Sequence, residues 1–199
     1  MELPFNTVYS QDILGNKIET PVADWPLKRE WVNYAFDELA AAGYGTSSAY
    51  TMVKDPSKVN FSYRDNLFSG SDLIATGVAS FGHISGVHYQ NNAEWAGYLG
   101  AIESGELPLM RGLKATPHQL LVREVILLLK RGYLDGDYFH HKLSVDILEE
   151  WSDVWRQYAE DGLLTVAAGD VRLTRKGLLE VDGMLPAFFE GAHQGVRYT

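Results

Sequence analysis

A loop bordered by glycines, residues 77–82 (G-V-A-S-F-G), is the segment best suited to bring backbone atoms against a ligand. Glycine has no Cβ, so the chain at Gly77 and Gly82 can approach another molecule closely. The spacing does not fit a dinucleotide-binding or P-loop fingerprint, and no Lys-Ser/Thr pair follows. The alternative interpretation is a tight turn between a strand and a hairpin.

Cationic side chains near this loop could bind carboxylates. Arg64 lies just upstream, and a guanidinium can hold a carboxylate through two parallel hydrogen bonds. The simpler interpretation is a surface arginine that pairs with Asp65 or another acid. Arg111 and Lys114 are further candidates. Downstream, Y-Q-N at residues 89–91 closes the predicted hairpin, where the asparagine could shape a turn.

The histidines do not predict a metal site. His83 and His88 are five residues apart, and His140 and His141 are adjacent, whereas zinc needs three or four ligands at suitable spacing. The chain has no cysteine, which excludes disulfides, a thiolate nucleophile and cysteine ligation of an iron–sulfur cluster. Neither a Ser-His-Asp arrangement nor a G-x-S-x-G elbow is present, so a hydrolase is unsupported.

Composition restricts the class of protein. The 199 residues are 46% apolar and 12% aromatic, enough for one large or two small domains with a real core. The net charge of -9 disfavours nucleic acids and anionic membranes as partners. No apolar run approaches membrane-spanning length and no signal peptide is recognisable, so we expect a soluble cytoplasmic protein.

The elements that would position these residues differ between the two halves. Residues 1–23 predict a short strand and a loop, and residues 24–43 a helix capped by Asp24 and ended by Gly43. Residues 44–53 and 73–78 predict strands, the second one buried, and residues 92–104 a helix. Helix followed by strand, twice over, is typical of the end of a βα barrel.

The C-terminal part predicts a second domain. Thr116 and Gln119 form a capping-box pattern that starts a helix ending near residue 131. Further helices are predicted over residues 137–143 and 144–161, then a hairpin over 163–173 and a final helix from Thr174 to about Glu190. This order is that of a winged helix. We therefore expect an α+β chain, with part of a (β/α) barrel over residues 1–111 and a winged-helix-like domain over residues 112–199.

A winged helix suggests DNA binding, but the charges oppose it. The third predicted helix would enter the major groove. It carries six acidic residues against one arginine, which would face phosphates with net negative charge. The acidic residues are Asp146, Glu149, Glu150, Asp153, Glu160 and Asp161, and the arginine is Arg156. The domain is better interpreted as a packing lid.

Several segments, taken in order, carry a family resemblance. They are residues 66–82 (NLFSGSDLIATGVASFG), 89–91 (YQN), 105–112 (GELPLMRG), 123–126 (REVI) and 173–179 (LTRKGLL), with E-L-P-F at residues 2–5. Together they resemble the C-terminal half of the oxygen-independent coproporphyrinogen III oxidases, which are radical S-adenosylmethionine (SAM) enzymes, and of relatives acting in heme utilisation. The resemblance covers nearly the whole chain.

The resemblance implies an enzymatic function to which this chain would contribute only one half of the protein. The family's [4Fe–4S] cluster binds a C-x-x-x-C-x-x-C run near the N-terminus of the full enzyme, so we expect a truncated chain, inactive alone, that binds neither cluster nor SAM. The missing N-terminal half would be its partner and would generate the 5′-deoxyadenosyl radical. This half would complete the barrel and cover the tetrapyrrole substrate. The residues expected to face substrate or cofactor are Gly77, Val78, Ala79, Ser80, Phe81, Arg64, Tyr89 and Asn91.

An alternative of a different class stays open. The chain could be a non-catalytic module that binds heme, another tetrapyrrole or another protein. Heme would require an axial ligand, for which His83, His88 and His193 are the candidates.

Overall fold

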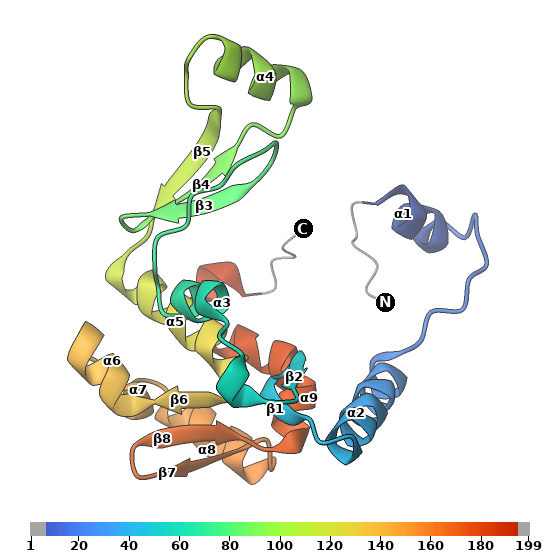
Figure 1. Cartoon of the computed structure of the whole chain (residues 1–199), viewed down its shortest axis with the longest axis vertical. Helices are drawn as coiled ribbons and strands as arrows, with labels where there is room; N and C mark the ends of the chain where they lie inside the picture. Colours follow the sequence, from blue (N-terminus) through green and yellow to red (C-terminus); the bar gives the residue numbers. More distant parts are fainter. Residues whose placement is uncertain (1–6, 195–199) are drawn as a thin grey trace.

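The computed structural model describes residues 7–194, and the predicted strand at residues 2–5 lies outside them. Figure 1 shows three parts: two N-terminal helices at one side, a C-terminal body, and an arm that projects away from the body. No helix in the described range has the length and apolar character needed to cross a membrane.

Two helices precede the first strands. Helix α1 (Val8–Leu14) occupies a segment that the sequence predicts as loop, because Thr7 accepts a hydrogen bond from the Ser10 amide and caps it. Helix α2 (Trp25–Ala41) confirms the predicted helix, with Asp24 accepting from the Leu27 amide at 2.9 Å. Helix α2 contacts α9 of the body.

The predicted strand at residues 44–53 is a tight antiparallel pair, β1 (Gly45–Ser48) and β2 (Thr51–Val53). The short 3-10 helix η1 (Pro56–Lys58) and helix α3 (Ser62–Phe68) follow. The predicted buried strand at residues 73–78 is wrong. Within this run only Leu73 pairs with a strand, through a bridge to His83 of β3, and Ile74 is 74% exposed.

The arm consists of β3 (Phe81–Ile84), β4 (Val87–Asn91), α4 (Trp95–Glu103) and β5 (Leu109–Lys114). The strands form an antiparallel sheet in the order β3-β4-β5, and α4 lies at the far end from the body (Figure 1). All six residues of β5 are exposed and α4 has no buried residue. The predicted domain boundary at residue 111 lies within β5, which ends at Lys114.

The C-terminal body contains the main core. Its helices and 3-10 turns are α5 (Pro117–Leu129), α6 (Gly136–Leu143), α7 (Ile147–Glu150), α8 (Ser152–Glu160), α9 (Arg175–Met184), η2 (Leu185–Phe188) and η3 (Gly191–His193). Its strands are β6 (Tyr133–Asp135), β7 (Leu164–Ala167) and β8 (Asp170–Leu173). They form an antiparallel sheet in the order β6-β8-β7, and the helices enclose a core that includes Val125, Leu129, Phe139 and Phe188.

Local sequence explains most of these boundaries. The capping box is present: the Gln119 amide donates to the Thr116 hydroxyl at 3.1 Å, and the Gln119 side chain accepts from the Thr116 amide at 3.0 Å. The predicted third helix is interrupted at Trp151, which has non-helical backbone angles. The predicted final helix continues past α9 only as the 3-10 turn η2, which contains Pro186.

Candidate functional site

The glycine-bordered loop leads into β3. It follows Leu73, which forms a backbone bridge to His83 of that strand. Gly77 has φ of +101°, a conformation that side chains with a Cβ rarely adopt. Ala79 also has positive φ, at 59°, which is strained for a residue with a Cβ. The Ser80 hydroxyl donates to the Thr76 carbonyl at 2.8 Å and closes the turn. The sequence signal at Gly77 therefore marks a real backbone requirement.

Three polar side chains hold this loop in place. The Ala75 amide donates to the Tyr89 hydroxyl at 2.9 Å, and the Gly77 amide donates to the Tyr98 hydroxyl at 3.0 Å. The side-chain amide of Asn91, which is 3% exposed, donates to the carbonyls of Ala75 (3.2 Å) and Gly77 (3.1 Å). The backbone groups of Ala75 and Gly77 are thus paired by side chains from β4 and α4.

The far end of the loop is fixed to the sheet. The Asn91 amide donates to the Ser80 carbonyl at 2.9 Å, and the Gln90 side chain donates to the Ala79 carbonyl at 3.1 Å. Arg111 from β5 donates to Gln90 Oε1 at 2.8 Å. Arg111, a candidate carboxylate ligand from sequence, is therefore engaged in supporting the loop.

An apolar cavity of about 620 Å³ lies beside the loop, inside the arm. It is lined by loop residues 74–76, the β3–β4 hairpin, α4 and residues 107–109. Tyr89, Asn91 and Tyr98 supply polar groups to an otherwise mostly aliphatic wall. A cavity of this volume, with few polar groups, suits a small organic molecule or part of a larger one.

The structure brings most of the predicted site residues together but leaves Arg64 apart. Tyr89 and Asn91 bind the loop that contains Gly77, and Phe81, which lies in the same loop and begins β3, stacks its ring on His88. Arg64 lies on α3, donates to Asp65 Oδ1 at 2.8 Å and to the Ser47 hydroxyl at 3.1 Å, and covers the ring of Phe61. Arg64 thus already has a carboxylate partner in this chain.

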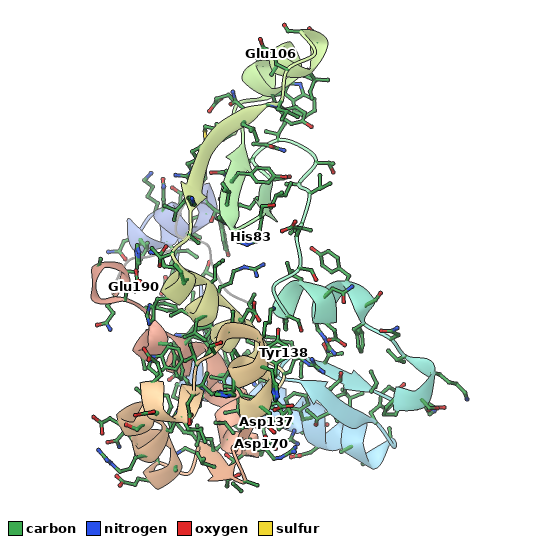
Figure 2. The ribbon with its side chains drawn as sticks, turned by 90° about the vertical axis from the view of Figure 1, so that its left-hand side faces the viewer. His83, Glu106, Asp137, Tyr138, Asp170 and Glu190 are labelled. Carbon is green, nitrogen blue, oxygen red and sulfur yellow. The ribbon has the colours of Figure 1, made fainter. Side chains whose placement is uncertain are left out.

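Two histidines lie at the base of the arm, one buried and one exposed. Figure 2 shows His83 there, with Glu106 at the far tip. His83 is 4% exposed, and its Nδ1 atom has no hydrogen-bond partner. Burial lowers the pKa of His83, and the positive charge of Arg123 on α5 lowers it further. Burial followed by Arg123 also lowers the pKa of His88. Both imidazoles are therefore favoured in the neutral form.

A buried charge network, missed from sequence, joins α3 to the body. Lys142 Nζ lies 2.8 Å and 2.9 Å from the carboxylate oxygens of Glu124, which is 5% exposed, and 2.6 Å from the Ser69 carbonyl. The Tyr138 hydroxyl donates to Glu124 Oε2 at 2.6 Å. A Cβ on Gly70 would collide with Glu124, so only glycine fits there. The one sequence signal was the spacing of four between Tyr138 and Lys142 on a helix.

Among residues 7–194, no group of three or more His, Asp or Glu side chains could hold a metal ion. With no cysteine in the sequence, the residues present do not fit an iron–sulfur cluster.

Comparison with known proteins bears on the whole chain. No protein-family profile matches it. The oxygen-independent coproporphyrinogen III oxidase of Pseudomonas aeruginosa is 23% identical over 175 residues, which are 81% of this chain and 38% of that protein. The same enzyme of Helicobacter pylori strain J99 is 29% identical over 122 residues, 59% of this chain and 27% of that protein.

The chain is similar in sequence to oxygen-independent coproporphyrinogen III oxidases. The resemblance inferred from the sequence motifs is confirmed. The structure of the coproporphyrinogen III oxidase of Escherichia coli, described as a radical SAM enzyme, matches 94% of this chain with a TM-score of 0.70 at 18% identity. The match covers 45% of that chain, so this chain spans less than half the length of the relatives it matches.

Proposed function

We propose that this chain is the C-terminal part of a radical SAM oxidoreductase that acts on a tetrapyrrole. The homology to coproporphyrinogen III oxidases and the fold match over 94% of the chain support it. SAM and the cluster would be held by the partner, an N-terminal half, because this chain lacks cluster ligands. The chain would be inactive alone and would act in the cytoplasm.

The observation that carries the proposal is the set of side-chain hydrogen bonds that holds residues 75–80 in place. Side-chain hydrogen bonds from β4 and α4 hold a strained glycine loop beside an apolar cavity. A fixed loop of this kind can place its backbone against a bound molecule without reorganising. We propose that residues 77–81 face SAM or substrate, with Tyr89 and Asn91 positioning them. Arg64, already paired with Asp65, is the weakest of the proposed contacts.

The domain roles follow from the same proposal. Residues 1–111 would complete the barrel. Every strand pair among the described residues is antiparallel, so the parallel strand partners of a barrel would have to come from the other half. Residues 112–199 would form a winged-helix-like lid. Its helix–strand order and its β6-β8-β7 sheet support that class, and acidic residues on α7 and α8 disfavour nucleic acid as a ligand.

Recombination tests the proposal. The chain would be mixed with a separately produced, cluster-reconstituted N-terminal half of a coproporphyrinogen III oxidase, and 5′-deoxyadenosine formed from SAM would be measured in the presence of coproporphyrinogen. We expect product above the level of either half alone, reduced by Tyr98→Phe, which removes the acceptor for the Gly77 amide. The matched control Tyr63→Phe alters a side chain on α3 that is 68% exposed. No gain on mixing would contradict the proposal.

A further inference from the structure

The imidazole of His83 has an unmet hydrogen-bonding requirement. The residue is only 4% exposed, and its Nδ1 atom has no hydrogen-bond partner. Leaving a buried polar atom unpaired costs about 1–3 kcal/mol, so native proteins rarely retain one without a reason. This atom can therefore form one further hydrogen bond, to a ligand or to a water molecule.

Arg123 supplies a charge at the same place. It lies on α5, and its charge lowers the pKa of both His83 and His88, whose ring centroids are 6.1 Å apart. Its guanidinium is partly buried and, within residues 7–194, takes part in no hydrogen bond or ion pair, although it carries five N–H donors. The neighbouring acid, Glu124, is bound to Lys142 and Tyr138 instead.

A second cavity, of about 330 Å³, adjoins Arg123. Its wall is almost entirely apolar and includes Val122, Ile126 and Phe189. The carboxylate of Glu190 also borders it but already accepts from the Gln119 side chain at 2.9 Å and contacts His118 at 3.2 Å. The cavity therefore offers an apolar surface with an unpaired cation at its rim.

Other acids near the histidines are also engaged. Asp72, whose charge raises the pKa of His83, accepts a hydrogen bond from the Ser85 amide at 2.9 Å. The acids near Arg123 and the two histidines therefore have other partners. The guanidinium and the neutral imidazoles are left to bind an anion. Arginine suits a carboxylate because its planar fork matches the two oxygens.

We propose that Arg123, with His83 and His88 beside it, binds a carboxylate group of an otherwise apolar small molecule. This inference rests on the proposed function, in which the ligand is a tetrapyrrole bearing carboxylate side chains. It assigns to Arg123 the carboxylate-binding role for which Arg64 was a candidate from sequence. One carboxylate oxygen would accept from the guanidinium and the other from a ring N–H of His83.

Metal-free coproporphyrin III, a stable tetracarboxylate, is the probe, and its tetramethyl ester is the neutral control. Binding to the full chain would be followed by porphyrin fluorescence. We expect Arg123→Gln to weaken coproporphyrin binding about tenfold, the size of one lost charge-assisted hydrogen bond. The ester should bind more weakly and be indifferent to the substitution. Arg156→Gln, which alters a 67%-exposed arginine on α8, should match the wild type.

A second measurement needs no porphyrin. Titration with succinate, followed by NMR of the histidine side chains, should shift the His83 and His88 signals in the wild type and not in Arg123→Gln, while the other histidine signals confirm an intact fold. Porphyrin binding that is unchanged by Arg123→Gln would overturn the carboxylate site and leave the proposed function standing. Succinate shifts without any porphyrin binding would support the site and count against the tetrapyrrole. Hemin binding lost in His83→Ala, with no coproporphyrin binding, would overturn the site in favour of iron ligation.

Discussion

Removing the ammonium group from the buried charge network should destabilise the body strongly. In Lys142→Met the Glu124 carboxylate, whose side chain is 6% exposed, keeps only the Tyr138 hydroxyl as a partner. Breaking a buried ion pair from one side costs about 3–5 kcal/mol. The Lys142 side chain is 36% exposed, and water can partly replace it, so we expect the lower end, about 3 kcal/mol.

The free energy of unfolding, from urea titration followed by tryptophan fluorescence, measures this cost. Trp155 is 3% exposed in the core and reports on the body. The control Lys58→Met removes a lysine that is 80% exposed and pairs with Asp55 at 3.0 Å, and should cost less than about 1 kcal/mol.

A double-mutant cycle separates the charge from the methylene packing. Adding Glu124→Gln to Lys142→Met removes the unpaired buried charge, so the double variant should recover about half of the loss. If Lys142→Met cost no more than Lys58→Met, or if the two changes were simply additive, the network would not couple α3 to the body as described.

Three further outcomes follow. Asn91→Ala should destabilise the arm by about 1–2 kcal/mol, seen as faster amide exchange in residues 75–80, because two partly buried carbonyls lose their donor; unchanged exchange would contradict the role of Asn91 in holding the loop. Gly177→Ala should cost at least about 1–3 kcal/mol, because its Cβ would meet a backbone carbonyl, whereas the control Gly183→Ala has open space and should stabilise α9 by up to about 1 kcal/mol; thermal unfolding tells them apart. Burial and the charge of Arg123 lower the pKa of His83 in the folded chain, so the unfolded chain binds a proton at a higher pH than the folded one does. The free energy of unfolding should therefore fall as the pH drops below about 6.5. His83→Leu should reduce that slope, and an identical slope would refute the attribution.

Local signals predicted the body well because they act within a few residues. The Thr116 capping box, the glycine after α5 and the hairpin signal near Gly169 each specify one turn of backbone, and each turn is observed. Strand pairing is not local. Strands β5 and β6 were not predicted, since each is identified by a partner from another part of the chain, β4 and β8.

The candidate site shows the same division. The backbone requirement at Gly77 could be inferred from residue type alone, and Tyr89 and Asn91 proved to lie against it. Residue type alone does not show which of Arg64 and Arg123 is already paired with a carboxylate. Only the spatial arrangement shows that the first has a carboxylate partner and the second has none among the described contacts.

The attachment of the arm has a mechanical consequence. Strand β5 ends at Lys114 and α5 begins at Pro117. Between them, the Ala115 amide donates to the Gly86 carbonyl at 2.9 Å, which joins the β3–β4 turn to the start of α5. Six residues of strand extend about 20 Å. A rotation of about 10° at this pivot would sweep the far end of β5, and α4 with it, through roughly 3–4 Å. A small repacking beneath Gly86, where Leu120 Cδ1 of α5 lies 3.8 Å from the position that a Cβ on Gly86 would take, would therefore be magnified at the tip of the arm.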